Sequence, residues 1–160
     1  MPLPPARQVV LRPTEPEDWP ALYRMGCDPE SNELAGTKAR TREAFMARWT
    51  EIARDPTVIA RTIWADGALA GSVNQFVQDG RNSIGYWIDR EHWGRGIATR
   101  AVGLMLAESA TRPLYATASA GNAASLRVLA RHGFEVLERR QSPETDRYLA
   151  RETVTLVLLS

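Results

Sequence analysis

The apolar and polar positions along the first third of the chain predict one strand followed by two helices. Residues 8–12 form a short β-prone segment, which a proline stops. Apolar side chains then recur every three or four positions over residues 16–25 and 41–55, the spacing of amphipathic helices. The intervening residues 26–39 are rich in Gly, Pro, Ser and Asn, so we expect a loop there.

A run of extended segments follows, at residues 57–65, 68–78 and 83–89. Asp-Gly pairs separate them, and such pairs are typical of hairpin turns. In the third segment Ile84, Tyr86 and Ile88 share one face while Trp87 lies on the other, so both faces are expected to be covered. This segment is therefore predicted to be a central strand.

The remainder of the chain alternates helices with short strands. A helix is predicted over residues 97–111, because Pro113 prevents its extension, and a strand over residues 114–118. Asn122 is a candidate N-cap for another helix, and Gly133 is placed to end it. The last two strands are predicted at residues 134–140 and 148–159, separated by a turn-rich segment at residues 141–147.

Composition places these elements in one ordinary domain, residues 1–160. The chain is 44% hydrophobic and 24% charged, which is typical of a soluble protein. A net charge of +1 supplies no field for nucleic acid or an anionic membrane surface, so neither is an expected partner. One cysteine and two distant histidines predict no disulfide framework and no metal site. Neither a secretion leader nor an apolar stretch of about 18 residues is present, so a cytoplasmic location is expected.

The segment Trp-Gly-Arg-Gly-Ile-Ala-Thr at residues 93–99 carries the clearest chemical signal. Its glycines permit a close backbone approach, and the helix that follows leaves its first N–H groups free for an anion, most naturally a phosphate. His92 is a neighbouring candidate for the same phosphate. The segment lacks both the third glycine of a dinucleotide fingerprint and the lysine of a P-loop. Taken alone, it could equally be a tight connection between a strand and a helix.

Four linked motifs extend this signal: Ser-Ile-Gly-Tyr-Trp-Ile-Asp at residues 83–89, the glycine segment at 93–99, Gly-Asn-Ala-Ala-Ser at 121–125, and Leu-Ala-Arg-His-Gly-Phe at 129–134. In this order they resemble the GNAT superfamily of acyl-CoA-dependent N-acyltransferases, and within it the RimJ/RimL-type ribosomal-protein alanine N-acetyltransferases. The resemblance implies a single α/β (α+β) domain with its cofactor-binding core at about residues 83–134. It implies a mixed, mostly antiparallel sheet of about six or seven strands, with a central splayed parallel pair and about four helices on both faces.

By the same resemblance, the cofactor is acetyl-CoA. Its pantetheine arm would lie between the strands at residues 83–89 and 114–118, and its pyrophosphate on the main-chain N–H groups of the glycine segment. Trp93 stands where the superfamily has Gln or Arg, whereas Gly96 and Ala98 fit the pattern. The residues assigned to the cofactor are Trp87, Ile88, Trp93, Gly94, Arg95, Gly96, Ile97, Ala98, Thr99, Asn122 and Ser125.

The implied reaction is direct attack of an amine on the acetyl thioester. It needs an N–H donor at the developing oxyanion, expected from the main chain around Trp87 and Ile88, and a proton for the departing thiolate. Many superfamily members use a tyrosine at the position of Leu129, so the resemblance points instead to Ser125 as proton donor. Asp89 and Glu91 are the nearest carboxylates for a general base, with loop solvation or a water relay as the alternatives.

The acceptor is predicted only as a primary amine, on a protein N-terminus or a small molecule. Glu33, Trp49 and Tyr86 are the candidate acceptor-binding residues, with Glu33 as a counter-charge for an ammonium group. A non-catalytic acyl-CoA sensor, an enzyme using a larger acyl group such as succinyl-CoA, and a binding protein for another nucleotide remain alternatives. A homodimer is the usual assembly among similar proteins.

Overall fold

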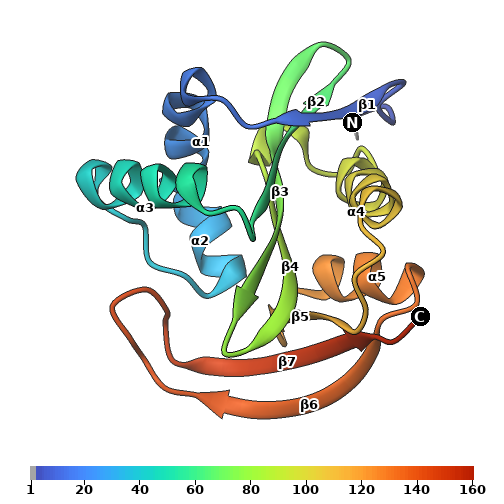
Figure 1. Ribbon diagram of the computed structural model, residues 1–160. Helices are drawn as coiled ribbons and strands as arrows, with labels where there is room; N and C mark the ends of the chain where they lie inside the picture. The colour runs from blue at the N-terminus through green and yellow to red at the C-terminus, as the bar shows by residue number, and fades with distance from the viewer. Residues whose placement is uncertain (1–2) are drawn as a thin grey trace.

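The computed structural model describes residues 3–160. They form a seven-stranded sheet with helices packed on both of its faces (Figure 1). Met1 and Pro2, the first residues of the predicted domain, lie outside the described residues. The elements in chain order are β1 (Val9–Pro13), the 3₁₀ helix η1 (Pro16–Asp18), α1 (Trp19–Gly26), α2 (Pro29–Ala35), α3 (Arg42–Arg54), β2 (Ile59–Ala65), β3 (Ala68–Gln78), β4 (Arg81–Ile88), the 3₁₀ helix η2 (Arg90–His92), α4 (Ile97–Glu108), β5 (Leu114–Ser119), α5 (Ala123–Arg131), β6 (Glu135–Ser142) and β7 (Arg151–Leu158).

The strand order β1-β2-β3-β4-β5-β7-β6 places β4 in the middle of the sheet. β4 pairs with β3 along its whole length in antiparallel fashion, as the predicted meander requires. Toward β5 it pairs in parallel, and only Ser83 is in register, opposite Tyr115. The two central strands therefore diverge, which confirms the predicted splayed parallel pair.

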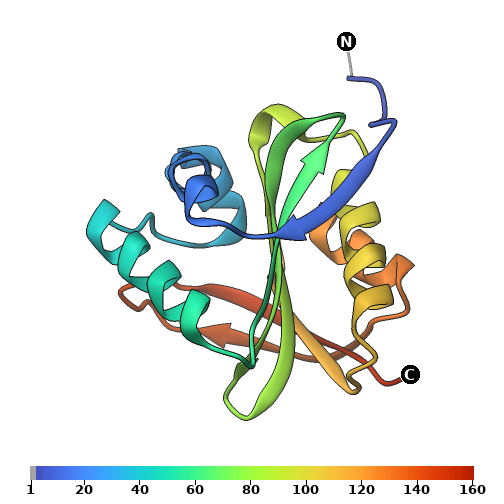
Figure 2. The same ribbon diagram turned by 45° about the horizontal axis from the view of Figure 1, so that its top comes forward.

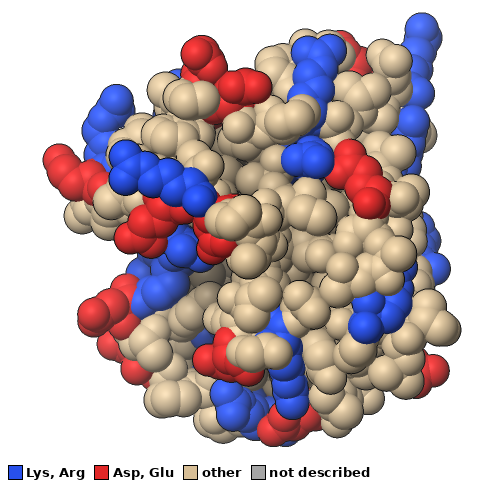
Figure 3. All heavy atoms as spheres, in the orientation of Figure 1, with Lys and Arg blue, Asp and Glu red and all other residues tan. Residues whose placement is uncertain are grey.

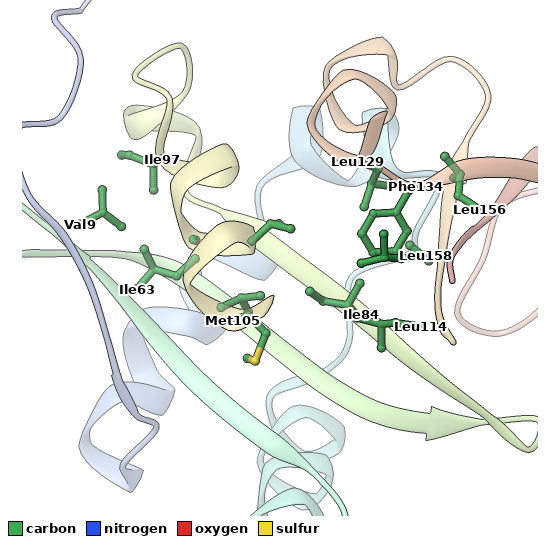
Figure 4. Packing of buried hydrophobic residues seen from close by; sticks show 14 of the residues in the cluster. Val9, Ile63, Ile84, Ile97, Met105, Leu114, Leu129, Phe134, Leu156 and Leu158 are labelled. Atoms are coloured by element: carbon green, nitrogen blue, oxygen red, sulfur yellow. The ribbon is translucent and has the colours of Figure 1, made fainter. Parts of the chain in front are cut away.

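Helices α1, α2 and α3 cover one face of the sheet, and α4 and α5 cover the other (Figure 2). Under α4 and α5 lies the larger core, built mainly from aliphatic side chains that are almost fully buried, with Phe134 packed beside Leu129 and Leu158 (Figure 4). Ile84, Tyr86 and Ile88 contribute to this core, as their shared face predicts. Within residues 3–160, no helix combines the length and the apolar character needed to cross a membrane.

The opposite face carries a smaller core in which Leu22, Met25 and Trp49 are buried. The Trp49 ring lies 6.4 Å from that of Trp19 and 6.3 Å from that of Phe45, measured between ring centroids. Phe45 and Trp49 are one helical turn apart on α3, so they present one stripe to α1. The assignment of Trp49 to acceptor binding is therefore corrected: its side chain belongs to the core and is 7% exposed.

The predicted loop at residues 26–39 contains a helix, α2, and this is the main error in the predicted elements. Asp28 caps α2 by accepting a hydrogen bond from the Ser31 N–H (2.9 Å), Pro29 opens it, and Gly36 ends it in the left-handed conformation (φ 71°). The Pro and Gly residues that predicted a loop thus mark the boundaries of a short helix. Residues 3–160 contain five α-helices, where about four were expected.

Other boundaries differ by a few residues. α4 ends at Glu108, three residues before the predicted end, because Ser109 is already extended (ψ 122°). β7 begins at Arg151, since Tyr148 instead forms an isolated bridge with Thr37. The predicted cap at Asn122 is confirmed: its side chain accepts the Ser125 N–H at 3.2 Å.

Candidate active site

A cleft lies beside β4 where β4 diverges from β5, and four parts of the chain line it: α2, the end of β4 with η2, the glycine segment with the first turn of α4, and α5 with its cap. It has a volume of about 250 Å³. The cofactor and acceptor candidates that the structure brings together there are Tyr86, Trp87, Ile88, Trp93, Gly94, Gly96, Ile97, Ala98, Asn122 and Ser125. None of its described lining residues is acidic, so the cleft suits an anionic ligand.

The glycine segment exposes its main chain to this cleft. Gly94 and Gly96 both take left-handed conformations (φ 76° and 74°), and a Cβ added at either would meet no atom within 4 Å. Open space therefore lies directly above the backbone at both positions. Gly96 caps α4 without a side-chain hydrogen bond, and the first turn of α4 contains no acidic residue. The positive end of the helix dipole and its free N–H groups thus face the cleft, as phosphate binding requires.

The edge of β4 that faces β5 supplies further main-chain groups. Asp89 donates its N–H to the Ala70 carbonyl at 2.8 Å, on the β3 side. Because main-chain groups alternate in direction along an antiparallel ladder, Trp87 also faces β3, whereas Tyr86 and Ile88 direct theirs into the gap. This refines the predicted oxyanion donor: the Ile88 N–H faces the cleft, and the Trp87 N–H does not.

Two residues of the glycine segment, Trp93 and Arg95, bond through their side chains to neighbouring parts of the chain. Trp93 donates its Nε1–H to the Ile88 carbonyl (3.0 Å) and so ties the segment to the end of β4. The Arg95 guanidinium is also engaged: Nη2 pairs with Asp66 (2.9 Å), Nε donates to the Pro4 carbonyl (3.2 Å), and Nη1 lies 2.8 Å from His92 Nδ1. The Arg95 side chain therefore points away from the phosphate region, which leaves only its main chain for the predicted role. Thr99 also does not line the cleft.

Tyr86 and Ser125 meet across the cleft. The Tyr86 hydroxyl lies 2.6 Å from Ser125 Oγ, and either oxygen can be the donor. Burial raises the pKa of Tyr86, against a smaller opposing effect of the hydrogen bond from Ser125. Tyr86 therefore stays neutral and keeps its proton at physiological pH. The sequence pattern placed both residues in the site, but their direct contact depends on how α5 packs against β4.

The candidate carboxylates do not line this cleft. Asp89 and Glu91 line a neighbouring polar depression with Asp28 and Arg90, and Asp89 caps η2. The structure therefore does not support either residue as a base acting within the cleft, because the turn after β4 directs them to the α1 side. Among the described residues no group of three or more His, Cys, Asp or Glu side chains could hold a metal ion.

The acceptor candidates are separated by the structure. Tyr86 lines the cleft, whereas Glu33 is exposed on α2 outside it, because the adjacent helical face carries Ser31, Leu34 and Ala35 toward the cleft. These three residues, together with Ala124 and Val128 of α5, are lining residues that the sequence did not reveal. The sequence signal that could have found Ser31, Leu34 and Ala35 is the pair of helix boundaries: Asp28-Pro29 at the start of α2 and Gly36 at its end.

Comparisons with known proteins agree with this geometry. The family described as Acetyltransferase (GNAT) domain matches residues 8–135. RimJ from Mycobacterium smegmatis, solved in complex with CoA-disulfide, is similar with 25% identity and a TM-score of 0.75 over 100% of this chain and 86% of that one. No curated protein sequence matches the chain.

Two further solved structures share the fold at lower identity. Spermidine N-acetyltransferase from Vibrio cholerae, in complex with CoA and spermine, has a TM-score of 0.82 at 14% identity, covering 95% of both chains. RimL, a ribosomal L7/L12 alpha-N-protein acetyltransferase in complex with coenzyme A, has a TM-score of 0.76 at 16% identity, covering 99% of this chain and 98% of that one.

Proposed function

Because the chain belongs to the acetyltransferase (GNAT) domain family, we propose that it transfers the acetyl group of acetyl-CoA to a primary amine by direct attack of the amine on the thioester. The observation that carries the proposal is the cleft beside the diverging end of β4, where the open glycine backbone, the start of α4 and the free edge of β4 meet. The similar structures of RimJ, RimL and spermidine N-acetyltransferase contain CoA or a CoA derivative.

The described residues suit each part of this ligand. The main-chain N–H groups of residues 94–98 would hold the pyrophosphate, since Gly94 and Gly96 leave the space above them open. The inward main-chain groups of Tyr86 would pair with an amide of the pantetheine arm, which would otherwise be buried without a partner. Bound there, acetyl-CoA supplies an activated acetyl group as a thioester.

The remaining chemistry falls to a few side chains and one main-chain group. The Ile88 N–H points into the gap, where it can stabilise the developing oxyanion. Ser125 would return a proton to the departing thiolate, and Tyr86, held at 2.6 Å, would replace that proton. Since neither Asp89 nor Glu91 lines the cleft, we assign the removal of the amine proton to a water relay.

The acceptor is a primary amine of a protein N-terminus or of a small molecule. The similar structures include enzymes named for each kind, RimL for a ribosomal protein and the Vibrio cholerae enzyme for spermidine. The α2 residues Ser31, Leu34 and Ala35 line the same cleft, so we place the acceptor beside them. The cytoplasmic location and the homodimer stay predictions.

Thermal melts with and without acetyl-CoA test the proposal first. At about one hundred times its dissociation constant, a ligand that binds only the folded protein adds about 2.7 kcal/mol to the free energy of unfolding. A melt that does not rise with acetyl-CoA contradicts the cofactor assignment. Release of free CoA thiol in the presence of a panel of amines then separates an enzyme from a non-catalytic sensor, and the same assay with succinyl-CoA tests the acyl group.

A further inference from the structure

His92, the last residue of η2, connects the cleft to a chain of hydrogen bonds that begins in the turn between β2 and β3. The residue is partly buried and lines the cleft together with Trp93 and Gly94. Its Nδ1 lies 2.8 Å from Arg95 Nη1, and Arg95 Nη2 pairs with Asp66 at 2.9 Å. The side chains of Asp66, Arg95 and His92 thus form a continuous line from that turn to the cleft.

The Arg95 guanidinium is held at all three of its nitrogen atoms. Besides the contacts of Nη1 and Nη2, its Nε donates to the Pro4 carbonyl at 3.2 Å. Its side chain is only 14% exposed. Asp66 is held in turn, because it accepts main-chain N–H groups from the start of the chain at 3.0 and 2.8 Å. The guanidinium therefore has little freedom to turn away from His92.

The partner of Nδ1 determines where the imidazole proton of His92 lies. A guanidinium is always protonated and can only donate, so Nδ1 is the acceptor in its hydrogen bond with Arg95. An accepting Nδ1 carries no proton, and the ring proton is therefore on Nε2. Within residues 3–160, no protein group forms a hydrogen bond with this Nε2. His92 thus keeps one N–H donor for a ligand.

The position of His92 directs this donor toward the cleft. Nδ1 faces Arg95, whose side chain points away from the phosphate region, whereas His92 itself lines the cleft beside the open backbone of Gly94. Figure 3 shows Lys and Arg atoms interspersed with Asp and Glu atoms on the face that it draws, rather than gathered in one basic patch. With a net charge of +1, binding of a phosphate depends on a few local donors.

We propose that His92 donates its Nε2–H to a phosphate oxygen of the acyl-CoA cofactor, and that Arg95 and Asp66 are positioning residues that hold the required tautomer. This inference rests on the proposed acetyltransferase function. A hydrogen bond to an anion is roughly twice as strong as one between neutral groups. The positive charge of Arg95 at Nδ1 polarises the imidazole and strengthens Nε2–H as a donor. The Arg95 side chain thereby serves the cofactor without touching it.

Two substitutions at position 92 test the donor, because each amide imitates one ring nitrogen. Gln places its amide nitrogen near the position of Nε2, whereas Asn places it near that of Nδ1. His92→Asn should raise the dissociation constant of acetyl-CoA by about tenfold, measured by calorimetry, because hydrogen bonds to charged groups are strong. His92→Gln should retain most of the affinity. Unchanged affinity in His92→Asn overturns the inference, and so do equal losses in the two variants.

Truncated cofactors show which phosphate His92 binds. Acetyl-dephospho-CoA lacks the ribose phosphate, and S-acetylpantetheine lacks every phosphate. If Nε2–H binds the pyrophosphate, the loss of affinity in His92→Asn is the same for acetyl-CoA and acetyl-dephospho-CoA. If it binds the ribose phosphate, the loss disappears with acetyl-dephospho-CoA. A loss that persists with S-acetylpantetheine overturns the assignment to a phosphate.

The imidazole nitrogens report the positioning role directly by NMR. The chain has only two histidines, so isotopically labelled histidine gives a simple spectrum, and the signals of His92 are those missing from His92→Gln. We expect an unprotonated Nδ1 and a protonated Nε2 in the wild type, and a mixture of both tautomers in Arg95→Gln. Acetyl-CoA should shift the Nε2 signal of His92. A protonated Nδ1 in the wild type, or no shift at saturation, overturns the inference.

Binding by the wild type keeps this inference apart from the proposed function. If the wild type binds acetyl-CoA and His92→Asn binds it equally well, the assignment of His92 fails and the acetyltransferase proposal stands. If the wild-type melt does not respond to acetyl-CoA, the proposed function fails, and the role of His92 fails with it.

Discussion

The two faces of the sheet are built by different means. On the α4–α5 face, the cleft uses main-chain groups of the glycine segment and of β4, set on a core of aliphatic side chains such as Ile97 and Met105 that are almost fully buried. On the α1–α3 face, the core is small and largely aromatic: Trp19, Phe45 and Trp49 pack with Leu22 and Met25. The first face suits a constant ligand, because backbone groups bind any CoA ester.

Trp87 is the contact between the two faces. Its side chain packs against the smaller core and donates its Nε1–H to the Met25 carbonyl (3.2 Å), while the residue also lines the cleft. Variants on either side therefore show whether the faces act independently.

The largest effect is expected from Trp49→Ala, which removes the centre of the aromatic core. Truncation of a buried aromatic side chain should lower the free energy of unfolding by about 3–5 kcal/mol, measured by urea denaturation. Where the variant stays folded, its acetyl-CoA dissociation constant should remain near that of the wild type. A comparable loss of acetyl-CoA affinity would mean that the faces are coupled through Trp87.

Gly96→Glu tests the opposite face. A carboxylate above the backbone, at a position with φ 74°, should remove the acetyl-CoA contribution of about 2.7 kcal/mol seen in a melt at one hundred times the dissociation constant. Gly80→Glu is the matched control, since Gly80 has φ 75° and the same open space, but lies in the turn at the far end of β4. The phosphate assignment is rejected if both variants keep the acetyl-CoA shift.

Ser125→Ala separates chemistry from binding within the cleft. We expect kcat to fall by about tenfold to one hundredfold, which is about 1.4–2.7 kcal/mol of activation free energy, with little change in KM for acetyl-CoA. Tyr86→Phe should act through the same pair, so the double variant should be little worse than either single one. Equal losses in kcat and in acetyl-CoA affinity would make Ser125 a binding residue.

The smallest effect is expected from Asp66→Asn, which weakens the support of the glycine segment. Asp66 accepts hydrogen bonds from the N–H groups of Arg7 and Gln8 and pairs with Arg95, and these backbone hydrogen bonds lower its pKa. The carboxylate therefore contributes stability above its ordinary pKa of about 3.9, and that contribution is lost as the pH falls through the lower value of the folded state.

Melts from pH 7 to pH 3 check the Asp66 prediction. The difference in melting temperature between wild type and Asp66→Asn should be present at neutral pH and should shrink below about pH 4. Asp79→Asn is the control, because Asp79 has the same φ of 51° in the next hairpin turn and forms no ion pair among the described residues. An equal, pH-independent change in both variants would assign the effect to turn conformation.

The sequence by itself determined the features whose signals are local. The glycine segment, the Asn122 cap and the alternation of β4 each depend on neighbours a few residues apart, so they could be predicted from propensity and spacing. The family resemblance then identified the cleft between β4 and β5. The same local view misread α2, because Pro, Asn and Gly mark helix ends as well as loops.

Only the tertiary structure decided which of these residues meet. The Tyr86–Ser125 contact joins residues 39 positions apart, the Asp66–Arg95 ion pair spans 29, and the bond from Arg147 to the Lys38 carbonyl spans 109. It also placed Trp49 in the core and turned Asp89 and Glu91 away from the cleft. The physical reason is that the direction of a side chain between packed elements depends on strand twist, register and packing. These produce no periodic pattern of residues in the sequence.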